Sequence, residues 1–131
     1  MKILCDRSIN IYLNMLVKIT DETHMQQQMT EYEQSDQLLV IEFFATWCAP
    51  CRAFAPKLAE IAETVPYVPF LLVDVDDCDE IAATYKVMAT PYFIFLKRGQ
   101  VVDKFAGANL EKFKNIIDEH SIAPETVTAV A

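Results

Sequence analysis

The sequence predicts a single-domain α/β fold in which buried strands alternate with amphipathic helices. Two almost wholly apolar runs, 38–45 and 70–75, have the length of strands, and such runs are typical of sheets covered by helices on both faces. Between them, apolar residues recur at spacings of three and four from Phe54 to Ala62, the period of an amphipathic helix. This alternation is the βαβ pattern of α/β proteins.

The other elements follow in chain order. Residues 16–19 predict a short strand ended by Thr20-Asp21, and the Glu-, Gln- and Met-rich stretch 22–34 predicts a first helix. The helix between the two apolar strands should run from Pro50 to about Thr64. Beyond the second apolar strand the pattern predicts a short helix at about 78–85, a hairpin of strands 92–96 and 101–105 with Gly99 in its turn, and a closing helix at 110–120.

Size and charge restrict the function. The 131 residues, 53% of them hydrophobic, suffice for one compact domain and not for two. The formal net charge of -8 argues against nucleic acid or anionic membranes as partners, because no broad basic face is available. No apolar run approaches the roughly 20 residues of a membrane span, and residues 1–14 lack the pattern of a secretory signal or transit peptide. We therefore expect a cytoplasmic protein.

Two of the four cysteines share a motif. Cys48 and Cys51 are three residues apart at the predicted start of a helix, which places their sulfurs one turn apart and close enough to form a disulfide. The free N–H groups and the dipole of a helix N-terminus favour thiolate over thiol. We therefore expect Cys48 to be a nucleophile and Cys51, one turn further in and less exposed, to be the resolving thiol.

Two other interpretations of the pair are weaker. A structural zinc site needs two more Cys or His ligands at matching spacing, and we expect no metal because the remaining candidates lie on different predicted elements: Cys5, His24, Cys78 and His120. An inert buried pair is the second alternative. Trp47 and Pro50 bracket the motif in a βαβ context, which favours redox chemistry.

Several segments resemble the thioredoxin family in order and spacing. They are Phe43-Phe44-Ala45-Thr46-Trp47-Cys48-Ala49-Pro50-Cys51-Arg52, Val73-Asp74-Val75-Asp76, Ala89-Thr90-Pro91, Lys97-Arg98-Gly99 and Gly107-Ala108-Asn109. The match covers a domain at 15–120, with an N-terminal extension at 1–14 and a C-terminal tail at 121–131. Asp76-Asp77-Cys78 and the segment at 107–109 are more similar to animal members than to bacterial ones. The resemblance implies the thioredoxin fold, a central five-stranded mixed sheet whose hairpin strands run antiparallel to the rest, with two helices on each face.

The resemblance also implies an activity. Members of this family are thiol-disulfide oxidoreductases that reduce disulfides of client proteins, such as peroxiredoxins, through a reversible dithiol pair, here Cys48 and Cys51. They are reset by a flavoprotein thioredoxin reductase drawing on NADPH, so the domain itself should bind no cofactor and act as a monomer. A cis peptide bond between Thr90 and Pro91 should lie against the sulfurs. The client-docking surface would comprise Trp47, Ala49, Pro50, Thr90, Pro91, Gly107 and Ala108, although Trp47 could instead pack in the core.

Two residues depart from the family pattern. Ala49 replaces the usual glycine between the cysteines, where the dipeptide helps set the reduction potential. Glu42 replaces the usual buried Asp, as in the disulfide isomerases, so an isomerase-like oxidoreductase remains an alternative, although isomerases have His in place of Pro50. The non-enzymatic alternative is a redox-gated binding partner, whose reduced surface holds another protein.

Glu42 carries the sharpest expectation. The resemblance places its carboxyl beneath the cysteine pair as the proton acceptor of the resolving thiol, and puts Leu72 where the neighbouring strand commonly has a lysine. Without an ammonium nearby, burial should raise the pKa of Glu42 from about 4.3 toward neutrality. The alternative is that this longer side chain reaches water or a backbone donor and titrates normally.

Overall fold

The computed structural model describes residues 16–123. The extension at 1–14 and residues 124–131 of the tail lie outside the described residues. The elements are β1 (Leu16–Lys18), α2 (Glu22–Tyr32), β2 (Leu39–Phe44), α3 (Ala49–Thr64), β3 (Phe70–Asp74), α4 (Asp79–Thr84), β4 (Tyr92–Lys97), β5 (Gln100–Ala106) and α5 (Leu110–His120). Their bounds agree with the predicted ones to within two residues.

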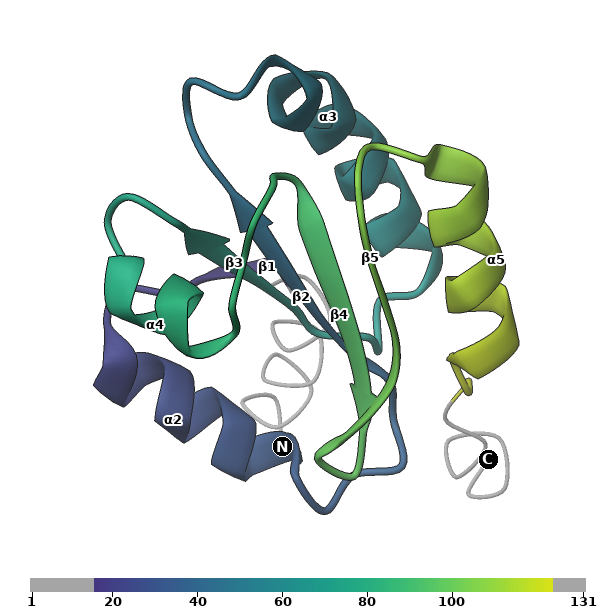
Figure 1. Ribbon diagram of the computed structural model, residues 1–131. Coiled ribbons are helices and arrows are strands. Elements are labelled where there is room, and N and C mark those ends of the chain that lie inside the picture. The colour runs from purple at the N-terminus through teal and green to yellow at the C-terminus, as the bar shows by residue number, and fades with distance from the viewer. Residues whose placement is uncertain (1–15, 124–131) are drawn as a thin grey trace, which may run out of the picture.

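The strands form one mixed sheet in the order β1-β3-β2-β4-β5. Figure 1 labels all five. β3 pairs in parallel with both β1 and β2, β4 pairs antiparallel with β2, and β5 antiparallel with β4. The expectation that both hairpin strands oppose the rest is therefore wrong for β5, which runs in the direction of β2. A tight hairpin reverses the chain once, so only one of its strands can oppose the other three.

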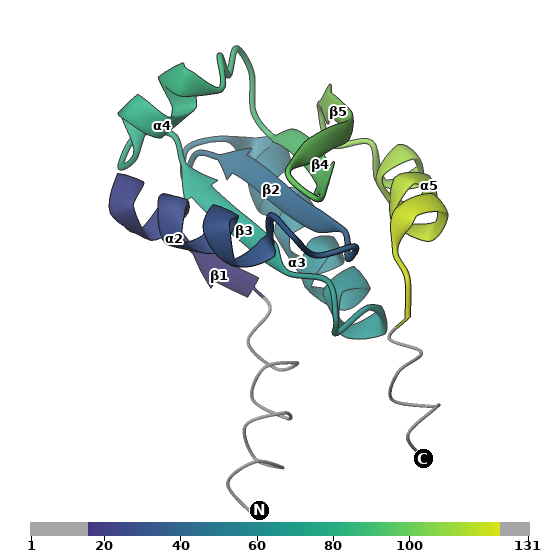
Figure 2. The ribbon, with the colours of Figure 1, turned by 90° about the horizontal axis from the view of Figure 1, so that it is seen from below.

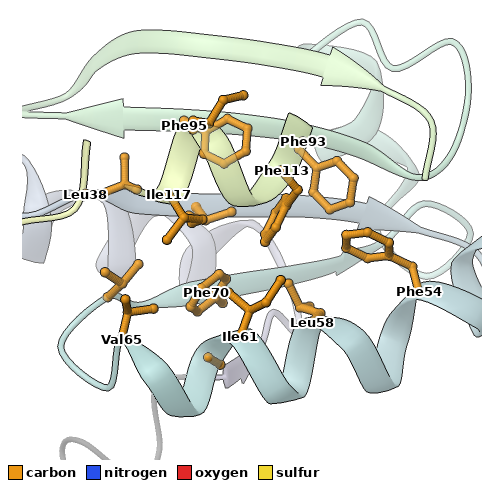
Figure 3. Close-up of a cluster of buried hydrophobic side chains, with 14 of the residues drawn as sticks. Leu38, Phe54, Leu58, Ile61, Val65, Phe70, Phe93, Phe95, Phe113 and Ile117 are labelled. Atoms are coloured by element: carbon orange, nitrogen blue, oxygen red, sulfur yellow. The ribbon is translucent and has the colours of Figure 1, made fainter. Parts of the chain in front are cut away.

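Each face of the sheet is covered by two helices (Figure 2), as expected. α3 and α5 enclose a core rich in phenylalanine, in which the rings of Phe54 and Phe113 meet edge to face with centroids 5.3 Å apart. Figure 3 shows these rings between the helices and the sheet. α2 and α4 cover the other face over a more aliphatic core. Both faces of β2 are thus buried, which explains its nearly continuous apolar sequence.

The β4–β5 hairpin turns where the sequence predicts. Arg98 and Gly99 both have positive φ, 52° and 74°, the backbone of a type I′ turn, whose twist suits a two-residue hairpin. The hairpin places the start of β4 and the end of β5 side by side, because Tyr92 pairs with Ala106. The loops before and after these two positions therefore meet at the edge of the sheet where β2 ends.

Candidate active site

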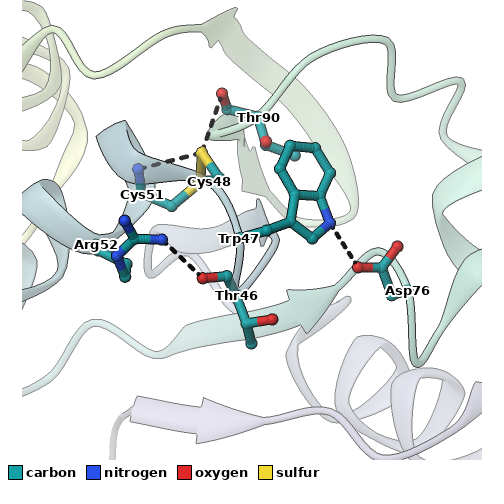
Figure 4. The surroundings of a disulfide bond; sticks show 7 residues. All are labelled: Thr46, Trp47, Cys48, Cys51, Arg52, Asp76 and Thr90. Carbon is teal, nitrogen blue, oxygen red and sulfur yellow. Dashed lines mark hydrogen bonds between the residues drawn. A yellow bond between two sulfur atoms is a disulfide. The ribbon is translucent and has the colours of Figure 1, made fainter.

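A disulfide joins Cys48 and Cys51 where β2 leads into α3 (Figure 4). Their Cα atoms are 5.2 Å apart. Cys48 is the N-cap of α3: its backbone is extended, and its Sγ accepts the backbone N–H of Cys51 at 3.2 Å. Pro50 stands in the first turn, where its missing N–H breaks no helical bond. The sulfur of Cys48 therefore receives both a donor and the positive end of the helix dipole.

Burial does not separate the two cysteines. Cys48 is 5% exposed and Cys51 4%, so Cys51 is the less exposed, as expected, but by a negligible margin. Both pack with Ala45 in a small apolar cluster. What distinguishes them is the helix, since Cys48 precedes its first turn and Cys51 lies within it.

A second loop reaches the sulfurs from the start of β4. The peptide bond between Thr90 and Pro91 is cis, as the resemblance implied, and the carbonyl oxygen of Thr90 lies 3.6 Å from Sγ of Cys48. Gly107 joins this loop by donating its N–H to the carbonyl of Pro91 at 2.8 Å. Gly107 has φ +106°, a conformation that favours glycine.

Trp47 lies on the surface beside the disulfide. Its side chain is 69% exposed, and its Nε1 donates to Oδ2 of Asp76 at 2.8 Å. The alternative that Trp47 packs in the core is therefore wrong. Asp76 itself is held by the buried Asp74, whose Oδ1 accepts the backbone N–H of Asp76 at 2.9 Å.

Two residues near the cysteines were not singled out by sequence reasoning. Asp76 orients the indole of Trp47, and Arg52 donates from Nη1 to the carbonyl of Thr46 at 3.0 Å (Figure 4). The sequence signal for Asp76 was its place in the motif after β3, but its partner lies 29 residues away along the chain. For Arg52, whose partner is a backbone carbonyl, no side-chain pattern marks the contact.

The expected docking residues form an accessible, mostly apolar rim around the disulfide. Thr90 and Gly107 are half-buried and Pro91 is buried. The others are exposed: Trp47, Ala49, Pro50 and Ala108. Two buried sulfurs thus lie beneath a small surface that carries few charges of its own.

Glu42 is a buried carboxyl at the centre of the sheet. It is 5% exposed, and its partners in register are Leu72 on β3 and Phe93 on β4. These residues lie on the face covered by α3, the helix that contains Cys51. Burial raises the pKa of Glu42 from 4.5 to about 7, which confirms the expected shift and its cause. The alternative of ordinary titration is not supported.

Within residues 16–123, no group of three or more His, Cys, Asp or Glu side chains is arranged to hold a metal ion. Among the helices of that range, none is long and apolar enough to cross a membrane.

Comparisons with known proteins agree with this geometry. The Thioredoxin family model matches residues 16–119. The chain is 43% identical to thioredoxin H-type 1 of Nicotiana tabacum over 110 residues, covering 81% of this chain and 86% of the relative. It is 40% identical to thioredoxin of Homo sapiens over 105 residues, covering 80% and 98%. Similarity to animal members therefore extends equally to plant ones.

Solved structures give the same result. The structure is similar to thioredoxin NaTrxh of Nicotiana alata, with TM-score 0.79, 28% identity, and coverage of 82% of this chain and 93% of the other. It is also similar to Fasciola hepatica thioredoxin, with TM-score 0.75, 40% identity, and coverage of 80% and 99%. The chain therefore belongs to the thioredoxin family, and it is a thiol-disulfide oxidoreductase with the disulfide-reductase activity of that family.

Proposed function

We propose that the protein reduces disulfides of client proteins with Cys48 as the attacking thiol and Cys51 as the resolving thiol. The observation that carries this assignment is the N-cap position of Cys48, whose sulfur accepts the backbone N–H of Cys51. A donor and a helix dipole aimed at one sulfur lower the free energy of its thiolate. Cys51 lies within the first turn of α3, bonded to Cys48 in the disulfide, and in this proposal it attacks Cys48 once the client is bound.

The reaction proceeds by two exchanges. The Cys48 thiolate attacks one sulfur of the client disulfide, forming a mixed disulfide and releasing the other client sulfur as a thiolate. Cys51 then loses its proton and attacks Sγ of Cys48, which breaks the mixed disulfide and frees the second client thiolate. The client has gained two electrons, and with protons from water two thiols. The oxidised product is the Cys48–Cys51 disulfide in Figure 4.

Glu42 is our candidate for the group that accepts the proton of Cys51, directly or through water. Its pKa of about 7 is matched to proton transfer near neutral pH. Its carboxyl lies on the sheet face that α3 covers. The apolar partners Leu72 and Phe93 leave burial as the cause of the shift.

The rim around the disulfide is our candidate client-docking surface. We assign it Trp47, Ala49, Pro50, Thr90, Pro91, Gly107 and Ala108. Exposed apolar groups surround buried sulfurs there, and the half-buried Thr90 can offer backbone hydrogen bonds to an extended client segment. Such contacts would hold the client sulfur over Cys48.

In this proposal the oxidised pair is reset by a thioredoxin reductase using NADPH, and the domain at 15–120 works as a cytoplasmic monomer on clients such as peroxiredoxins. The test is the reduction of insulin in the presence of NADPH and a thioredoxin reductase. The loss of NADPH absorbance measures the rate. We expect many turnovers for the wild type and none for Cys48→Ser. Binding of insulin without NADPH consumption would instead favour a redox-gated binding partner.

A further inference from the structure

Met88 is an apolar side chain almost entirely in water. It is 93% exposed, the highest value among the large hydrophobic side chains of residues 16–123. The others with substantial exposure are Leu16, Trp47, Val101 and Ile122. Exposed apolar groups beside a functional site mark contact with partners more often than isolated ones do. Met88 contributes little to the core, and what sets it apart from an isolated exposed residue is its place in the loop that reaches Cys48.

The backbone that presents Met88 is fixed from its N-terminal side. α4 ends in a Schellman motif, in which the N–H of Val87 bonds to the carbonyl of Ala82 and the N–H of Lys86 to that of Ala83, each at 3.0 Å. Lys86 takes the left-handed conformation of this motif, with φ 56°. Val87 then packs against the core beneath α2 and α4.

The loop is also fixed beyond Met88. Pro91 is buried, and its carbonyl accepts the N–H of Gly107. Two anchored residues, Val87 and Pro91, thus bracket a short loop that exposes the large apolar side chain of Met88. A preorganised backbone reduces the entropy lost when a partner binds, and the unbranched thioether adapts to apolar partners of different shape.

The loop brings Met88 close to the reacting sulfur. The carbonyl of Thr90 is 3.6 Å from Sγ of Cys48, and Met88 precedes Thr90 by two residues, so their Cα atoms are at most about 7 Å apart. An extended client segment that puts its sulfur over Cys48 and continues along the loop before Thr90 would therefore reach Met88 within one or two residues of its own cysteine.

We propose that Met88 is a specificity-determining residue that binds an apolar side chain next to the reacting cysteine of the client. The inference rests on the proposed function, because it requires a client segment at Cys48. Clients with leucine, methionine or an aromatic residue beside the disulfide are then reduced faster than clients with a polar residue there.

Two disulfide-linked model peptides test this, identical except that leucine flanks each cysteine in one and serine in the other. Pre-reduced protein is mixed with each peptide in excess, and the second-order rate constant of a single turnover is measured by counting peptide thiols. The readout is the leucine-to-serine ratio of rate constants. The variants are Met88→Ser, the conservative Met88→Leu, and Val101→Ser as a matched control. Val101 is also exposed, at 54%, but lies at the far end of β5.

We expect a ratio of about ten for the wild type, the effect of removing about 50 Å² of apolar surface from water. Met88→Leu and Val101→Ser should keep that ratio, and Met88→Ser should lower it to about two or less. An unchanged ratio in Met88→Ser, or no preference in the wild type, would overturn the role of Met88. Bis(2-hydroxyethyl) disulfide separates this from failure of the proposed function: if the wild type reduces neither this disulfide nor a peptide, the reductase assignment itself fails.

Discussion

Two cysteines of this protein begin helices, but the charges and hydrogen bonds around them differ. Cys48 caps α3, a helix of 16 residues, and Cys78 caps α4, a helix of 6. The two are almost equally buried, 5% and 6% exposed. If a position at a helix N-terminus were enough to activate a thiol, both would be reactive.

The charges around the two sulfurs oppose that conclusion. The first turn of α3 holds no acid, whereas α4 begins with Asp79 and Glu80. Burial raises the pKa of Cys78, and the carboxylates of Asp77, Asp74 and Asp21 raise it further. Its side chain makes no cap hydrogen bond, and its Sγ lies 3.7 Å from the carbonyl of Ile19. A helix start thus favours a thiolate only where burial and nearby carboxylates do not outweigh the dipole.

Removing one sulfur at a time should give the largest effect. Cys48→Ser should abolish disulfide reduction, because no attacking thiolate remains. Cys51→Ser should accumulate a stable mixed disulfide with the client, visible as a heavier band on a non-reducing gel. Wild-type insulin reduction by Cys48→Ser would refute the assignment of roles. Cys78→Ser serves as the matched control and should retain full activity.

Neutralising Glu42 should give the next largest effect on the reaction. We expect Glu42→Gln to slow the release of the mixed disulfide by about 10- to 100-fold, within the range of general base catalysis, and to leave the first attack nearly unchanged. Stopped-flow measurement of the two steps separates them. The control is Glu60→Gln, the same change at an exposed glutamate on α3. An equal rate of release in both variants would contradict the role of Glu42.

The same substitution should change stability with a definite sign. In the folded protein Glu42 has its pKa raised from 4.5 to about 7, so the native state keeps a proton that the unfolded chain releases. The free energy of unfolding of the wild type should therefore fall as the pH rises from about 4.5 to about 7, by about 3 kcal/mol at 1.36 kcal/mol per pKa unit. Urea unfolding of Glu42→Gln should lack this decline and show higher stability above pH 7.

An acid placed next to Cys48 would make its surroundings resemble those of Cys78, which has Asp77 as its neighbour. We expect Ala49→Asp to raise the pKa of the Cys48 thiol and to slow its alkylation several-fold at pH 7, through repulsion of the thiolate. Ala49→Asn has the same shape without the charge and is the control. Equal alkylation of the two variants would show that a charge beside Cys48 does not control its reactivity.

The helices and strands could be predicted from the sequence, but several contacts between them could not. The periodicity of residues 38–64 fixes a strand followed by a helix, and with it the cysteine pair at the junction. The bond between Trp47 and Asp76, and that between Gly107 and Pro91, join segments whose proximity depends on the strand order. Local pattern carries no information on that order. The burial of Glu42 could be predicted because an acid within an apolar central strand must be buried. The strand register then places Leu72 beside it.

The smallest effect is expected from the N-terminal extension. Deletion of residues 1–14 should leave reductase activity and melting temperature nearly unchanged, because the family match begins at residue 16. The deletion also removes Cys5, so this thiol no longer contributes when the thiols of the protein are counted. A fall of several degrees in melting temperature would show that apolar residues of the extension pack on the domain.

The contrast between the two helix starts is tested most directly by alkylation of the fully reduced protein with iodoacetamide, followed residue by residue by mass spectrometry from pH 5 to 9. Cys48 should react with a midpoint below about 8.5, the value of a free thiol. Cys78 should remain unmodified at pH 7 while the protein is folded, and react once urea unfolds it. Alkylation of Cys78 at the rate of Cys48, or a midpoint for Cys48 at or above 8.5, would contradict the account.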